Sequence, residues 1–129
     1  MGAWGSGSFD NDTALDWVSE LESDSDGSVL RRAFASFPEE DNGCMAIAAA
    51  EVVAAATGRP LSNLPEEIGE WLATNRGVVN ADLRTEASAI VRTIRDDSEL
   101  RELWDEVGAH LWLEDVDDLL DRLATETPA

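Results

Sequence analysis

Apolar residues recur every three or four positions along most of the chain, and no stretch alternates convincingly between apolar and polar residues. Residues three and four apart share one face of an α-helix, whereas a half-buried strand alternates with a period of two. The pattern therefore predicts a succession of amphipathic helices. Their apolar positions are, in chain order, Leu15, Val18 and Leu21, flanked by Ala14 and Trp17; Leu30, Ala33, Phe34 and Phe37; Ile68, Trp71 and Leu72; Leu83, Ala87, Ile90, Val91 and Ile94; Leu100, Leu103, Trp104, Val107 and Leu111; and Val116, Leu119, Leu120 and Leu123.

A further helix, predicted over residues 44–57, differs from the others because it is apolar on nearly every side. A helix of this kind is buried all round, and its alanines allow neighbouring helices to approach closely. Gly58 and Pro60 follow it, which is typical of a helix end and the stop beyond it. We therefore expect an all-α fold, in which residues 1–129 form a single compact bundle of six or seven helices around this central Ala-rich helix.

The helix starts and the chain ends carry their own signals. Candidate caps or first residues of the helices are Asp10, Asn11 and Asp12, then Ser28, Pro65 and Asn80. Residues 1–9 form a Gly-rich arm, which we expect to be ordered because Trp4 and Phe9 supply large apolar anchors. Residues 125–129 are predicted to be a frayed tail.

The chain contains 28 acidic residues and nine arginines, has no lysine, and carries a formal net charge of −19. Such a chain repels phosphate backbones and anionic membrane surfaces, so neither a nucleic acid nor a membrane is an expected partner. The carboxylates of residues 114–121 form a dense acidic face, and Asp117, Asp118, Asp121 and Arg122 lie opposite the apolar positions of the last helix. Such a face is usually only solvated, but it would also attract a basic protein partner. Candidate interface residues are Trp112, Asp117, Asp118 and Asp121, although burial in the core is the more common role of a tryptophan.

The chain has one cysteine, Cys44, and one histidine, His110, which excludes an internal disulfide and the usual zinc clusters. A catalytic pair of these two residues is a weaker hypothesis than a buried structural cysteine. No cofactor is expected. No signal peptide is apparent, and the longest apolar run, residues 44–50, is too short to span a bilayer. We therefore expect a cytoplasmic location.

Two acidic segments have the spacing of possible cation sites. Residues 22–29 imitate the first eight positions of a calcium loop, but Ala33 stands where that loop needs a bidentate glutamate. A solvated turn between helices is therefore the favoured interpretation. Asp10, Asp12 and Asp16 together offer oxygen ligands for a hard cation, but capping and favourable charge at a helix N-terminus explain them better.

Glu51 lies in the middle of the apolar helix, where an unpaired charge is costly. One interpretation is a reactive or ligand-binding carboxylate with a raised pKa. The other is a structural carboxylate that accepts hydrogen bonds from the N-terminal arm, from a tryptophan indole such as that of Trp4, or from an arginine. The structural interpretation is favoured, because buried polar groups normally have hydrogen-bond partners.

Several strings of residues resemble a known family. Residues 1–17 read MGAWGSGSFDNDTALDW, residues 48–55 read AAAEVVAA, Gly58-Arg59-Pro60 follows, and residues 97–104 read DSELRELW. With these strings the chain resembles the bacterial domain-of-unknown-function family 4259 over nearly its whole length. The resemblance implies a small bacterial intracellular helical protein, and it implies neither an activity nor any catalytic residue.

Two classes of function remain open. The leading hypothesis is a non-enzymatic acidic module that binds a basic protein, for example as a toxin-neutralising immunity factor or an accessory factor. The alternative is a small enzyme or ligand-binding protein with a carboxylate pocket around Glu51 and Asp10 or Asp12, beneath the Gly-rich arm. Candidate residues for such a site or for a structural network are Glu51, Trp4, Asp10, Asp12 and Asp16.

Overall fold

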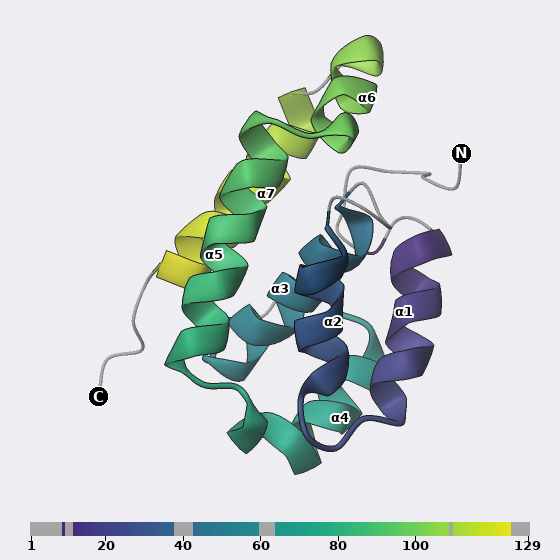
Figure 1. Cartoon of the computed structure of the whole chain (residues 1–129), viewed down its shortest axis with the longest axis vertical. Coiled ribbons are helices and arrows are strands. Elements are labelled where there is room, and N and C mark those ends of the chain that lie inside the picture. Colours follow the sequence, from purple (N-terminus) through teal and green to yellow (C-terminus); the bar gives the residue numbers. More distant parts are fainter. Residues whose placement is uncertain (1–8, 10–11, 38–42, 60–63, 109, 125–129) are drawn as a thin grey trace.

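The computed structural model describes residues 9, 12–37, 43–59, 64–108 and 110–124, and these residues form helices and connecting turns without any strand (Figure 1). The elements are α1 (Asp12–Glu22), α2 (Ser28–Ser36), α3 (Cys44–Ala56), α4 (Glu66–Asn75), the 3-10 turn η1 (Arg76–Val78), α5 (Ala81–Asp96), α6 (Glu99–Val107) and α7 (His110–Ala124). The predicted all-α fold is confirmed. The predicted tail at 125–129 lies outside the described residues.

The central element is α3, as its sequence predicts. It packs against α1, α2, α5 and α7 (Figure 1), and every residue from Ala46 to Ala55 is buried. Small side chains make this possible, because helices can approach closely where the contact surface consists largely of alanine. A helix surrounded in this way brings any polar group that it carries into the middle of the protein.

Both ends of α3 depend on a glycine. At its C-terminus the Gly58 N–H donates to Ala55 O (3.0 Å) and the Arg59 N–H donates to Ala54 O (3.0 Å), with Gly58 at φ 96°. This is a Schellman motif, and it confirms Gly58 as the residue just beyond the helix. At the N-terminus Gly43 has φ 119°, and a Cβ added there would lie 3.0 Å from Ile94 of α5. Glycine is therefore needed at residue 43 for its backbone conformation and for this close packing.

The start of α2 differs from the prediction. Ser28 is the first residue of the helix rather than its cap, the N-cap is Gly27, and the upstream carboxylate of Asp24 holds the first turn. It accepts hydrogen bonds from the N–H groups of Gly27 (2.7 Å) and Val29 (3.4 Å) and from the Ser28 hydroxyl (3.0 Å). Asp24 is itself buried, and its carbonyl oxygen accepts the Trp71 indole N–H (2.9 Å). The turn between α1 and α2 is thus fixed by a side chain four residues upstream of the predicted cap.

In α1 the buried face is shifted by about one position from the predicted one. Leu15, predicted to be apolar and inward, is 40% exposed, while Ala14 and Trp17, predicted to flank the apolar face, are buried with Val18. The wide indole of Trp17 determines which way the helix faces, because burying it removes more apolar surface from water than burying a leucine does. Phe9, one of the two predicted anchors of the arm, is buried in the same core. The rest of the arm, including Trp4, lies outside the described residues.

The predicted stripe from Leu100 to Leu111 is divided between two helices. α6 ends at Val107, Gly108 takes φ 103°, and α7 begins at His110. Because the chain turns here, the last apolar positions of the predicted stripe do not reach the core. Val107 is 69% exposed and Leu111 is 65% exposed.

Candidate functional site

Glu51 and Arg122 form a buried ion pair that joins the central helix to α7. The Arg122 Nη1 donates to Glu51 Oε1 (2.7 Å) and its Nη2 donates to Glu51 Oε2 (3.2 Å), so two nitrogens of the guanidinium meet both oxygens of the carboxylate. Glu51 is 1% exposed and Arg122 is 7% exposed. Paired hydrogen bonds of this kind are the strongest that neighbouring charged side chains make. The structure therefore contains the arginine alternative of the structural interpretation.

Arg122 continues the network beyond Glu51. Its Nε donates to Asp118 Oδ2 (2.8 Å) and its Nη1 donates to the carbonyl oxygen of Arg59 (3.3 Å). Burial alone would lower the pKa of Arg122, but the hydrogen bonds and charges of Glu51 and Asp118 outweigh it and raise the pKa. The guanidinium therefore stays charged. The prediction that Arg122 lies on the exposed polar face of α7 was wrong, because its side chain turns into the core to pair with Glu51.

The predicted interface acids of α7 are each engaged by an arginine of the same chain. Asp117 Oδ1 accepts from Arg95 Nη1 (3.0 Å), Asp118 is held by Arg122, and Asp121 Oδ2 lies 3.8 Å from Arg59 Nη2. A partner that used these carboxylates would have to compete with the arginines already bound to them.

Trp112, the fourth predicted interface residue, lies in the core instead. It is 3% exposed, and its ring stacks on that of Trp104 with centroids 6.4 Å apart and an interplanar angle of 11°. Trp104, predicted as a core residue, is only partly buried against that core. The helix break at Gly108 explains why Trp112 is buried and Trp104 is only partly buried. The new helix α7 points Trp112 into the core, whereas Trp104 on α6 lies nearer to the protein surface.

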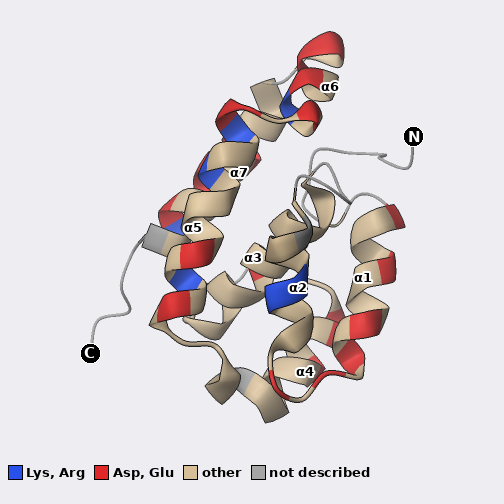
Figure 2. Cartoon of the chain, viewed as in Figure 1, with Lys and Arg blue, Asp and Glu red and all other residues tan. Residues whose placement is uncertain are grey.

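A second acidic region lies on the other side of the molecule, where α1 packs against α4. Neither helix contains an arginine, and acidic residues are marked on both in Figure 2. All of its acidic side chains are exposed, and none forms an ion pair within the described part of the chain. This α1–α4 acidic surface consists of Asp12, Asp16, Glu20, Glu22, Glu66, Glu67 and Glu70.

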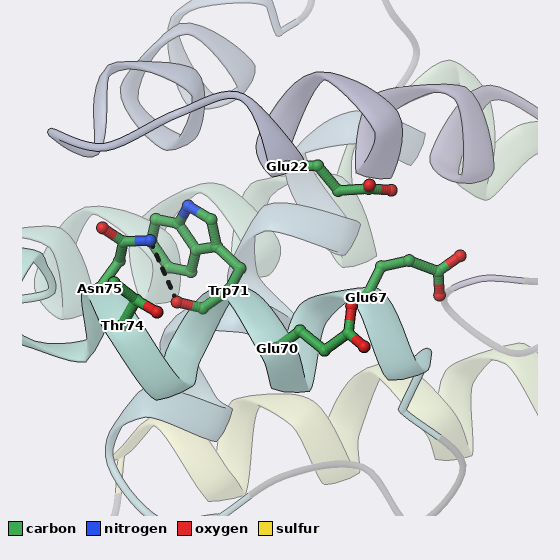
Figure 3. A pocket seen from close by; sticks show the side chains of 6 residues that line it. All are labelled: Glu22, Glu67, Glu70, Trp71, Thr74 and Asn75. Atoms are coloured by element: carbon green, nitrogen blue, oxygen red, sulfur yellow. Dashed lines mark hydrogen bonds between the residues drawn. The ribbon is translucent and has the colours of Figure 1, made fainter.

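A hollow of about 240 Å³ opens within this surface, between the end of α1 and α4 (Figure 3). The carboxylates of Glu22, Glu67 and Glu70 lie on one side of it, and Trp71 and Asn75 lie on the other. The Trp71 indole N–H is already bound to the Asp24 carbonyl oxygen, and Asn75 Nδ2 donates to the Trp71 carbonyl oxygen (3.2 Å). The aromatic wall is therefore fixed, while the carboxylates are available to a cationic group.

The other predicted site residues do not assemble into a reactive group within the described chain. Asp12 and Asp16 are exposed on α1, and Asp10 lies outside the described residues. His110 pairs with Glu114 (2.8 Å) at the exposed start of α7. Among the residues described, no three histidine, cysteine or carboxylate side chains are placed to hold a metal ion. None of the described helices has the length and apolar character needed to cross a membrane.

Comparison with known families supports the resemblance seen in the sequence. The family model described as a domain of unknown function, DUF4259, matches residues 2–115. The chain belongs to this family. The match includes Glu51 and the whole α1–α4 acidic surface, whereas Arg122 lies beyond it. No curated protein and no solved structure matches the chain.

Two features of the site were not predicted, although the sequence contains a signal for each of them. Glu51 is the only charged residue of α3 and Arg122 is the only arginine of α7, so a pair between them was available to prediction. The arginine-free character of α1 and α4 is also visible in the sequence. That these two helices pack together is visible only in the fold.

Proposed function

We propose that this protein is a non-enzymatic interaction module that binds a basic protein partner through the α1–α4 acidic surface. The observation that carries the proposal is the absence of ion-pair partners for seven exposed carboxylates within the described chain, on two helices that pack side by side. Clustered like charges repel one another, and a basic partner would relieve this repulsion while the field accelerates its approach. Neutralising a basic toxin or escorting a basic protein are functions of this kind.

The hollow between α1 and α4 supports the same proposal. Its three carboxylates offer acceptors for an arginine or lysine side chain, while Trp71 behind them is buried in the core and holds its wall in place. The paired acids of α7 support it less, because Arg59, Arg95 and Arg122 already occupy Asp121, Asp117 and Asp118. The partner we propose therefore presents lysine or arginine to α1 and α4.

The enzyme hypothesis receives less support from the geometry. It needs Glu51 to be available to a substrate, and both oxygens of Glu51 accept hydrogen bonds from Arg122 in the core. A carboxylate held in this way is suited to joining two helices rather than to transferring a proton.

The test is a titration of isotope-labelled protein with an oligolysine peptide at low salt, followed by amide chemical shifts. We expect the shift changes to concentrate on α1 and α4. The variant Glu20→Gln, Glu22→Gln, Glu67→Gln, Glu70→Gln should bind at least about tenfold more weakly, because each lost charge contact is worth about 0.3–0.5 kcal/mol.

The matched control removes the same charge from α5 and the start of α6 through Asp82→Asn, Glu86→Gln, Asp97→Asn and Glu99→Gln, all of which are exposed. Its affinity for the peptide should fall by a smaller factor. Equal losses in the two variants would show that total charge decides binding, and would contradict the assignment to α1 and α4.

A further inference from the structure

The apolar stripe of α6 becomes progressively more exposed toward the end of the helix. Leu100 is 7% exposed, Leu103 and Trp104 are partly buried, and Val107 is 69% exposed. Leu111, in the first turn of α7, is 65% exposed. These spacings place Leu100, Leu103, Trp104 and Val107 on one helix face, which in a helix covered by its own domain would be buried along its whole length.

The position of α6 in the fold explains this gradient. α6 lies at one end of the molecule (Figure 1), and it packs mainly against α5. The Ser98 hydroxyl caps its start by accepting the Arg101 N–H (3.1 Å), and the Trp104–Trp112 stack holds its middle against α7. The last turn extends beyond these contacts. We call Leu103, Trp104, Val107 and Leu111 the apolar end.

Single exposed apolar residues are ordinary on protein surfaces and need no explanation. Leu15 on α1 is such a case, with 40% exposure. The apolar end differs because its two most exposed aliphatic side chains lie on either side of the turn at Gly108, where α6 ends and α7 begins, and continue a stripe that includes the partly buried Leu103 and Trp104. An exposed apolar surface bordered by charged residues is typical of a surface that a partner covers.

The charges around the apolar end indicate the chemistry of that partner. Glu102 and Glu106 on α6 are exposed and form no ion pair with the residues that the structure describes. The nearby arginine and histidine side chains already have acidic partners. Arg101 donates through Nε to Asp105 (3.1 Å) and through Nη1 to the Arg95 carbonyl oxygen (2.8 Å), and His110 pairs with Glu114 (2.8 Å).

We infer that the apolar end is a second docking site, which takes an amphipathic helix of a partner protein whose apolar face is bordered by lysine or arginine. The apolar face would cover Val107 and Leu111, and the basic border would meet Glu102 and Glu106. A second copy of this chain fits less well, because two apolar ends in contact would bring like carboxylates together with every nearby arginine or histidine already paired. The site is separate from the α1–α4 acidic surface, so either assignment can fail without the other.

The test uses two designed helical peptides of equal length, one with a leucine face bordered by lysine and the other with the same face bordered by glutamate. Binding of the fluorescently labelled peptides to the full chain is measured by anisotropy at about 0.15 M salt, where exposed charges act over only about 8 Å. We expect the lysine-bordered peptide to bind and the glutamate-bordered peptide to bind at least about tenfold more weakly.

Variants then locate the binding site. Val107→Ser with Leu111→Ser should weaken binding of the lysine-bordered peptide about tenfold or more. Leu15→Ser, the matched substitution at an exposed leucine of α1, should leave the affinity unchanged. The four-glutamine variant of α1 and α4 should reduce the affinity by a smaller factor than Val107→Ser with Leu111→Ser does. Far-ultraviolet circular dichroism checks that each variant keeps the helical content of the parent.

Four results would overturn the inference. The first three are no binding of the lysine-bordered peptide, equal binding of the two peptides, and unchanged affinity after Val107→Ser with Leu111→Ser. The fourth is a concentration-dependent dimer in sedimentation that these two substitutions abolish, since it would assign the apolar end to a second copy of this chain. Failure of oligolysine to bind the unsubstituted protein at α1 and α4 would contradict the proposed function alone.

Discussion

Two regions of this protein carry the same net charge but differ in how many of their carboxylates are paired with arginine. The helices α1 and α4 together contain seven carboxylates and no arginine, whereas α5, α6 and α7 contain twelve carboxylates and five arginines. In the second region the arginines bridge helices or residues, as Arg95 does between Asp96 and Asp117. In the first region no carboxylate has such a partner among the described residues. Net charge alone therefore does not reveal which acidic surface is open to a partner.

The helix ends show the same contrast. α5 and α7 have Arg95 and Arg122 in their last turns, where a cation interacts favourably with the helix dipole. α1 instead ends with Glu20 and Glu22 and has no basic residue in its last turn. The α5–α7 region is partly compensated within the fold, and the α1–α4 acidic surface retains repulsion that stability measurements can detect.

The largest expected effect comes from breaking the buried ion pair between Glu51 and Arg122 of α7. Glu51→Ala leaves the Arg122 guanidinium buried without its carboxylate and should lower the free energy of unfolding by about 3–5 kcal/mol. Glu51→Gln keeps the size but replaces one acceptor oxygen with an NH₂ donor, so it should cost nearly as much. Urea unfolding of both variants measures the loss.

The control replaces both charges at once. Glu51→Met combined with Arg122→Met removes the buried ions and keeps apolar volume, so it should be much less destabilising than Glu51→Ala or Glu51→Gln. If Glu51→Ala proves as stable as the parent, the pair is not a structural element, and a reactive or ligand-binding carboxylate becomes the better hypothesis.

Salt should stabilise the protein by screening the charges of the α1–α4 acidic surface. Raising the salt concentration from about 10 mM to about 0.2 M shortens the screening length to below about 8 Å and weakens repulsion among exposed carboxylates. We expect the melting temperature to rise by about a few degrees. The rise should be smaller in the four-glutamine variant of α1 and α4 than in the matched variant of α5 and α6. A melting temperature that stays flat or falls with salt would show that the charges are already compensated.

Removing the acids at the end of α1 should be stabilising. Glu20→Gln with Glu22→Gln relieves an unfavourable interaction with the helix dipole and mutual repulsion, and should add about 0.3–1 kcal/mol to the free energy of unfolding at low salt. The comparison is Asp117→Asn, which removes a carboxylate bound to Arg95 and should not stabilise. Urea unfolding measures the two variants in parallel. If the free energy of unfolding changes in the same direction in both, the contrast between the α1–α4 and α5–α7 regions is refuted.

The smallest effect is electrostatic and local to the compensated region. The Arg95 guanidinium hydrogen-bonds the Asp96 carboxylate and holds the pKa of Asp96 below its ordinary value. Because the folded pKa is depressed, this contact contributes stability above the ordinary pKa, and the contribution is lost as the pH falls through the folded pKa. Arg95→Gln should raise the pKa of Asp96 toward its ordinary value in a carboxylate NMR titration. An unchanged titration would show that Arg95 does not hold Asp96 in solution.

Much of the fold was predictable because it rests on local rules. The apolar spacing from Leu83 to Ile94 predicts α5, and Asn80 caps that helix as expected by accepting the Leu83 N–H (2.9 Å). The continuous apolar sequence of α3 predicts its central place. Where two local signals competed, prediction failed. The spacing from Leu100 to Leu111 fits one helix, and the φ > 0 turn at Gly108 divides it.

The candidate site was predictable only in part, since it depends on partners that are distant in the sequence. Glu51 was identified as a residue that needs a partner, but Arg122 lies 71 positions away and appeared to belong to a solvated face. The acids of α7 looked like an open surface because Arg59 and Arg95 come from other parts of the chain. The pairing of these charges is set by helix packing.

By itself, therefore, the sequence determined the helices, the central place of α3, the family and the excess of negative charge, because each depends on residue type and spacing. Tertiary structure alone decided which carboxylates are neutralised and which remain open, and which apolar side chains stay outside the core. The physical reason is the distance along the sequence over which each kind of interaction acts. Helix formation depends on neighbours within about four residues, whereas an ion pair or a buried contact requires two segments to meet, and only the packing of helices around α3 brings them together.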